Sequence, residues 1–144
     1  MADLGLSIID ETVQTTNIWL NEIDDRIGAG KQSAYHVLRA GLHALRDRLT
    51  ADEAVHLGQQ LPTLIRGIYF EGWRPSATPI LDRSLDAWLG TVEGHLRSQN
   101  ETGTDARQAA EAVFGVLRKH VDEGEFRHLE VQMPGDVADL MRAA

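Results

Sequence analysis

The sequence predicts an all-α protein, with eight helices forming two tandem four-helix repeats packed as one domain. Apolar residues recur at spacings of three and four along most of the chain, which is the pattern of amphipathic helices. The second half of the chain repeats the first. No stretch of five or more residues alternates apolar and polar side chains with the β-branched enrichment of a strand.

The repeat has an offset of 72 residues. Seven of the 18 residues at positions 45–62 recur identically at that offset, where chance gives about one. Nearer the start of each copy the offset is 69, which aligns Trp19 with Trp88. We therefore predict one domain over 1–144, with repeat units at about 10–72 and 80–142 and a proline- and glycine-containing linker at 72–79.

The first two helices of each unit are predicted from stripes, which are rows of apolar residues along one helix face. The first helix carries apolar or small residues on one face up to Ile27, and the second carries leucines. The corresponding helices of the second copy keep the same spacing. The four stripes are Val13, Thr16, Leu20, Ile23 and Ile27; Leu38, Leu42, Leu45 and Leu49; Leu85, Leu89, Val92 and Leu96; and Ala110, Val113, Leu117 and Val121.

The third and fourth helices of each unit have recognisable starts. Thr50 and Glu53 form a capping box, in which a hydroxyl and a carboxylate satisfy free backbone amides reciprocally. The second copy places Asp122 and Glu125 there. Prolines 62 and 134 end that helix and are suited to open the next. In the linker, Thr78 as cap and Pro79 at the first helical position predict the start of the second unit.

Three segments resemble the family called domain of unknown function 2267. They are Ala34–Leu49, the stretch from Glu53 to Pro62, and Gly67–Trp73. The resemblance extends over nearly the whole chain and weakens at 1–9 and 98–104. It implies a bacterial, helical protein built of two such units, and it implies no activity.

Composition and charge exclude several classes of function. The chain has no cysteine, which excludes disulfides and thiolate metal sites, and its net charge is −8, divided evenly between the two halves. Without a basic stripe, nucleic acid and anionic membranes are not expected partners. No apolar run approaches the ~18 residues of a membrane span, and no positively charged leader begins the chain. We expect a cytoplasmic protein without a cofactor.

One pattern suggests a metal site. A Glu and a His three residues apart share a helix face, and two such pairs contribute to the di-iron sites of helical bundles. The chain has Glu53 with His56 and Glu125 with His128. Both glutamates occupy capping-box positions, and the proline-ended helices are short for such a site. The preferred interpretation is a repeated capping and packing pattern, with metal or small-ligand binding as the alternative.

The remaining polar residues do not predict catalysis. His36, His43 and Asp47 lie along one line of the second helix, and His43 with Asp47 could chelate one ion. The second copy lacks this set, which favours a polar helix face. No serine lies in a nucleophile elbow, and no glycine-rich phosphate loop follows a strand. We therefore predict a protein that is not an enzyme.

The end of the first unit carries the most apolar surface. Its last helix places apolar groups on more than one face, with Tyr69, Phe70 and Trp73 beside Arg74. One interpretation is that the second unit covers these rings. The other is a surface for self-association or for another protein, because such residue types dominate interface hot spots. The predicted function is a helical interaction module, either a homodimer or a partner of an unidentified protein.

Overall fold

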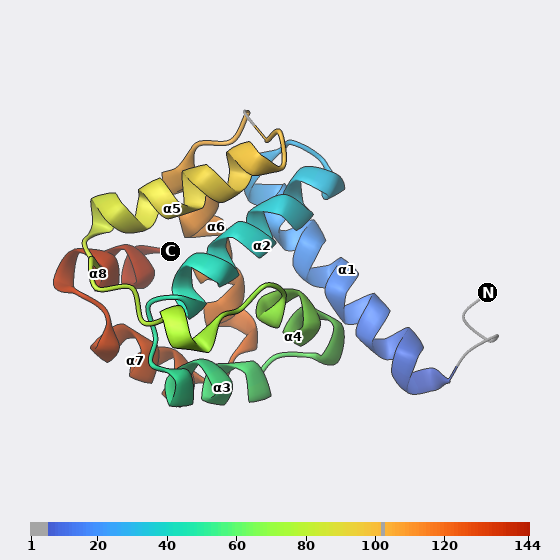
Figure 1. Ribbon diagram of the computed structural model, residues 1–144. Helices are drawn as coiled ribbons and strands as arrows, with labels where there is room; N and C mark the ends of the chain where they lie inside the picture. The colour runs from blue at the N-terminus through green and yellow to red at the C-terminus, as the bar shows by residue number, and fades with distance from the viewer. Residues whose placement is uncertain (1–5, 102) are drawn as a thin grey trace.

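The computed structural model describes residues 6–101 and 103–144, which form eight α-helices (Figure 1). No strand occurs in these residues, so the all-α prediction is confirmed. A single 3₁₀ turn, Pro75–Ala77, lies in the linker. The helices are α1 (Ser7–Ile27), α2 (Lys31–Arg46), α3 (Ala51–Gln59), α4 (Thr63–Phe70), α5 (Leu85–Ser98), α6 (Ala106–His120), α7 (Glu123–Gln132) and α8 (Gly135–Ala143).

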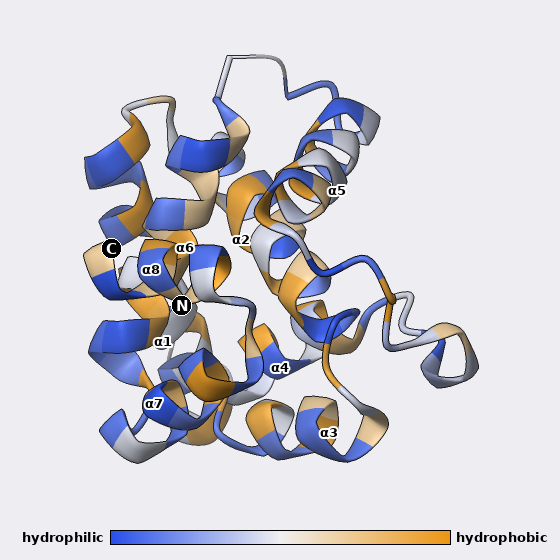
Figure 2. Ribbon diagram, turned by 90° about the vertical axis from the view of Figure 1, so that its left-hand side faces the viewer, coloured by the Kyte–Doolittle hydropathy of each residue, from blue (hydrophilic) through white to orange (hydrophobic). Residues whose placement is uncertain are grey.

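Helices α2 and α6 form the centre of the molecule. They pack against each other, and α1 and α5 each contact both of them. The shorter α3 and α4 pack together at one end, and so do α7 and α8 (Figure 1). All eight helices contribute to one continuous hydrophobic core, whose largest buried side chains are Trp19, Trp88, Tyr69 and Phe114. Figure 2 shows the hydrophobic segments turned towards the interior of the bundle.

The linker divides the helices four and four. Several apolar residues paired by the internal match are buried in both halves: Trp19 and Trp88 are enclosed, as are Leu57 and Leu129. Contacts between the halves are also reciprocal, because α1 packs on α6 and α2 packs on α5. The tandem-repeat organisation and its unit boundaries remain a prediction that these positions support.

The caps decide where several helices begin. The capping box of Thr50 and Glu53 is present, with both reciprocal hydrogen bonds formed. The predicted start at Thr78 and Pro79 is wrong: the chain stays non-helical to Ser84, whose hydroxyl caps α5 at Leu85. The reason is tertiary, because the Ile80 amide donates to the Asp47 carbonyl and holds this segment along the end of α2.

Arginines at repeat-equivalent positions close the last helix of each half. Arg46 is buried, and its Nη1 donates to the carbonyls of Tyr69 and Glu71 at 2.7 and 2.9 Å. Arg118 donates in the same way to the carbonyl of Arg142 at 2.6 Å. Cations that bind free carbonyls at a helix C-terminus stabilise it. This shared role accounts for an arginine being one of the identities between the copies.

Candidate functional site

The aromatic end of α4 lies largely inside the molecule. Tyr69 is fully buried, and its hydroxyl donates to the Ala54 carbonyl at 2.7 Å. Phe70 is half-buried, with its ring centroid 4.8 Å from that of Tyr69 and 5.4 Å from that of Trp73. Tyr69 is therefore not available to a partner of this protein, contrary to its expected place on a contact surface.

The element that accommodates these rings is α3 of the same half. A Cβ atom at Gly58 would lie 2.4 Å from Phe70 Cζ, so the glycine provides the space that the ring occupies. The expected cover by the second half is not what the structure shows, because α4 packs mainly on α1, α2 and α3. Of the four residues predicted to bind a partner, Trp73 is half-buried and only Arg74 is exposed.

The two Glu-His pairs do approach each other, at the seam between α3 and α7. His56 Nδ1 is 3.1 Å from Glu125 Oε2, and the His56 and His128 ring centroids are 6.2 Å apart. The Glu125 side chain is 6% exposed, against 52% for His56. Its Oε1 is buried and has no hydrogen-bond partner among the described residues. Glu53 does not join them, because its carboxylate serves the capping box.

The two glutamates differ because their caps differ. Asp122 accepts hydrogen bonds from the amides of both Gly124 and Glu125, so α7 is capped by that one carboxylate. A second carboxylate beside it would add like-charge repulsion. Glu125 turns inward instead and meets His56. The expectation that both glutamates act as caps therefore holds for Glu53 and is wrong for Glu125.

The seam is not a preformed metal centre. Within residues 6–101 and 103–144, no three His, Asp or Glu side chains are placed to hold one ion. What the seam provides is a buried carboxyl group whose Oε1 has no hydrogen-bond partner among the described residues, beside His56, whose ring is in turn close to that of His128.

The two histidines of α2, His36 and His43, each interact with a different partner. His36 Nδ1 lies 2.8 Å from Glu101 Oε1, which also accepts from the Ser33 hydroxyl. The hydrogen bond to His36 is the main cause that lowers the pKa of Glu101. His43 is buried, with Nε2 2.7 Å from the Ile68 carbonyl oxygen, and the Asp47 carboxylate accepts from Arg46. The alternative in which His43 and Asp47 chelate one ion is therefore not formed by these side chains.

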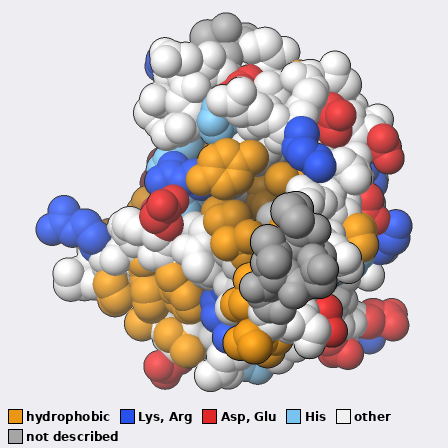
Figure 3. All heavy atoms as spheres, turned by 90° about the vertical axis from the view of Figure 1, so that its right-hand side faces the viewer, with side chains coloured by type: hydrophobic (Ala, Val, Ile, Leu, Met, Phe, Trp, Pro, Cys, Tyr) orange, Lys and Arg blue, Asp and Glu red, His pale blue; other side chains and the backbone are white. Residues whose placement is uncertain are grey.

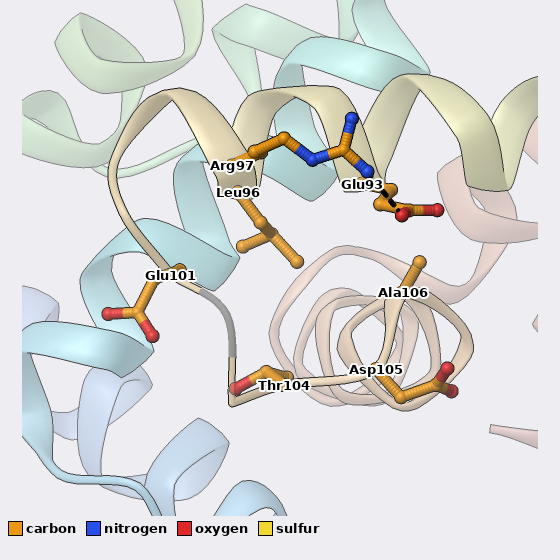
Figure 4. Close-up of a pocket in the computed structure, with 7 residues that line it drawn as sticks. All are labelled: Glu93, Leu96, Arg97, Glu101, Thr104, Asp105 and Ala106. Atoms are coloured by element: carbon orange, nitrogen blue, oxygen red, sulfur yellow. Dashed lines mark hydrogen bonds and ion pairs between the residues drawn. The ribbon is translucent and has the colours of Figure 1, made fainter.

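A cavity of about 330 Å³ lies between the end of α5 and the start of α6 (Figure 4). Its acidic groups already have structural roles. Glu93 forms an ion pair with Arg97, Glu101 holds His36, and Asp105 caps α6. Among the described residues that line it, no unpaired acid and base converge. The lining residues are Glu93, Leu96, Arg97, Glu101, Thr104, Asp105 and Ala106.

The exposed apolar surface lies elsewhere, on the first turns of α1. This helix begins beyond the rest of the bundle (Figure 1), and its buried side chains start at Thr16, although α4 already contacts it at Thr12. Leu6, Ile9 and Val13 are 71, 53 and 44% exposed, although they continue the stripe that Leu20 and Ile23 bury. Ile8 is also exposed. It lies about 160° around the helix from Leu6 and so on another face. We call the surface formed by Leu6, Ile9, Val13 and Leu64 the α1 overhang.

Leu64 joins this surface because α4 begins against α1. The Leu64 amide donates to the Thr12 hydroxyl at 2.9 Å, and the Leu64 side chain is 41% exposed. Figure 3 shows hydrophobic side chains gathered on the face towards which the start of α1 points. Sequence periodicity could have identified the stripe as far as position 6. It could not show that Leu6, Ile9 and Val13 stay exposed beside the described part of the bundle.

Comparisons with known proteins identify a family. The model of the uncharacterized conserved protein family DUF2267 matches residues 16–140, and the chain therefore belongs to this family. No curated protein sequence matches the chain. No helix of the described residues is long and apolar enough to cross a membrane.

Proposed function

We propose that this member of DUF2267 is a cytoplasmic, non-enzymatic helical module that binds another protein through the α1 overhang. The proposal depends mainly on one observation: four aliphatic side chains, three on one face of α1 and one at the start of the adjacent α4, are 41–71% exposed. Single exposed aliphatic residues are ordinary on a protein surface. A contiguous group on a projecting helix is typical of an interface.

The rest of the molecule supports binding over catalysis. The acidic groups of the cavity between α5 and α6 are engaged in capping and ion pairs. His43 is held by a backbone carbonyl inside the bundle. In contrast, the α1 overhang has no structural partner among the described residues beyond α4. Covering such a surface gains roughly 25 cal/mol for each Å² of apolar area removed from water.

Site-specific photo-crosslinking tests this proposal. A photoreactive amino acid replaces Ile9 in one variant and Ile18 in another, and both proteins are irradiated in the native host. These two isoleucines are 53 and 51% exposed, and nine residues place them on opposite sides of α1. We expect a protein adduct of defined mass from position 9 only, and its loss when Val13→Lys is added.

Two results decide the outcome of the crosslinking. Equal adducts from both positions, or none from position 9, would contradict the proposal. An adduct of twice the chain's mass would identify the homodimer.

A second candidate function is binding of a divalent metal ion. It is favoured by Glu125 Oε1 at the α3–α7 seam, which is buried and has no hydrogen-bond partner among the described residues. Coordination requires the His128 ring to turn towards Glu125, since the described side chains do not form a ligand set. Histidine nitrogens and a carboxylate suit Zn²⁺. We expect calorimetric titration with ZnCl₂ to show one site that Glu125→Gln removes and Glu53→Gln retains. Equal Zn²⁺ binding by both variants would exclude the α3–α7 seam as the metal site.

A further inference from the structure

We infer that the occupant of the α1 overhang is a cationic amphipathic helix of a different protein, with Lys or Arg beside an aliphatic face. This inference rests on the proposed function and specifies the partner's chemistry. It is carried by the shape of the apolar surface, by its charge and by the way in which the neighbouring acidic groups are used.

The shape fits a helix. Leu6, Ile9 and Val13 are spaced by three and four residues, so they form a straight stripe about 10 Å long on α1. Leu64 of α4 lies alongside, held by the hydrogen bond of its amide to Thr12. The surface is built from helices and offers no free strand edge for an extended peptide. A partner helix with aliphatic residues at the same spacing can pack along it.

The charge beside the stripe is negative. Between positions 6 and 25 the chain has five acidic residues and no Lys, Arg or His. Glu22 is paired with Lys119 and His120, and Asp24 accepts from the Gly30 amide. Asp10 and Glu11 form no ion pair with a described residue, and Asp10 lies about 40° around the helix from Leu6. The Asp10 carboxylate is therefore next to the apolar stripe, whereas Glu11 lies on the opposite side of α1.

The negative charge beside the stripe favours one kind of partner for the α1 overhang over the others. A second copy would add another Asp10 carboxylate to the same surface, and each chain has a net charge of −8. An anionic membrane surface would be repelled in the same way. A helix with Lys or Arg flanking its apolar face places opposite charges at the rim, which speeds association and suppresses wrong partners.

The test uses an 18-residue peptide of Leu and Lys, with leucines on one helical face and a fluorescent label. Binding to the full chain is followed by fluorescence polarisation. The first comparison peptide keeps the pattern with Glu for Lys, and the second scrambles the same Leu and Lys. We expect only the patterned Leu/Lys peptide to bind with measurable affinity, and added salt to weaken that binding.

Protein variants test whether the Leu/Lys peptide binds at the α1 overhang. Ile9→Lys and Leu64→Lys should each weaken it about tenfold, because each places a cation within the apolar surface. Ile18→Lys adds the same charge at an equally exposed isoleucine on the opposite side of α1 and should change binding less than twofold. Asp10→Asn should weaken binding about threefold and reduce its salt dependence. Circular dichroism melts verify that all four variants fold.

The outcomes separate this inference from the proposed function. Equal binding of the scrambled or Leu/Glu peptide, or equal effects of Ile9→Lys and Ile18→Lys, would overturn the cationic helix. If position 9 still crosslinks a protein in that case, the interaction module stands with a partner of other chemistry. If position 9 captures nothing, both proposals fail together.

Discussion

Replacing Gly41 with alanine is expected to destabilise the protein by about 1–3 kcal/mol, although alanine normally favours a helix. Gly41 lies in the middle of α2, where that helix crosses α6. An added Cβ would lie 2.6 Å from Val113 Cγ2 and 2.9 Å from Val113 Cβ. The second of these atoms is fixed to the α6 backbone, so relief requires the two central helices to separate.

Gly94 provides the matched control for Gly41. It lies on the exposed side of α5, with nothing within 4 Å of an added Cβ. Gly94→Ala should stabilise the protein by about 0.5–1 kcal/mol, the usual gain of alanine over glycine within a helix. Urea unfolding followed by far-UV circular dichroism measures both changes.

A double-mutant cycle isolates the contact. Val113→Ala removes both Cγ atoms, so Gly41→Ala should cost less in that background than in the wild type. If Gly41→Ala stabilised the wild-type protein as Gly94→Ala does, the close crossing of α2 and α6 would be contradicted.

The second large effect is a loss of stability in mild acid, caused by His43. Burial is the main factor that lowers the pKa of His43 to about 4, and the nearby Arg46 and Arg39 act in the same direction. Nε2 faces the Ile68 carbonyl, so this nitrogen carries the proton of the neutral ring. Protonation therefore has to charge Nδ1 inside the bundle.

The direction of the effect follows from proton uptake. An unfolded histidine has a pKa near 6.5. Between pH 6.5 and 4 the His43 imidazole is therefore protonated in the unfolded chain but stays neutral in the folded protein. The free energy of unfolding therefore contains the full contribution of neutral His43 above pH 6.5. It falls by roughly 2 to 3 kcal/mol as the pH is lowered to 4. Burial also lowers the pKa of His95, which adds a smaller loss in the same direction.

Urea unfolding at several pH values from 7 to 4.5 measures this loss, and His43→Gln is its control. The glutamine amide can still donate to the Ile68 carbonyl but does not titrate. The variant should lose much less stability between pH 6.5 and 4.5 than the wild type. If both lost the same amount, the acid sensitivity would belong to other groups. The carboxylates with lowered pKa values, such as Glu71 and Glu101, titrate at more acidic pH.

The helices themselves could be predicted because their signals are local. Apolar spacing of three and four, the Thr50–Glu53 box and the paired prolines act within a few residues of one another. The internal match also aligned Glu53-His56 with Glu125-His128 before any contact was known. The structure then brought His56, Glu125 and His128 to one seam, with Glu53 left in its cap.

The predictions that failed depended on neighbours distant in sequence. Tyr69 was expected at a surface, but Ala54 accepts its hydroxyl and Gly58 leaves room for Phe70 beside it. Pro79 was expected to begin a helix, but the Asp47 carbonyl holds the following residue along α2. Neither contact has a signal in the spacing of the residues concerned.

Local sequence determined the all-α class, the helix stripes and most of the caps, because hydrogen bonds and periodicity within a helix involve near neighbours. Only the tertiary structure decided which stripes are covered. Leu6, Ile9 and Val13 have the same pattern as Leu20 and Ile23, yet the bundle covers only the later pair. Burial requires a surface from another part of the chain, and no helix of the described bundle extends along the first turns of α1 beyond the start of α4.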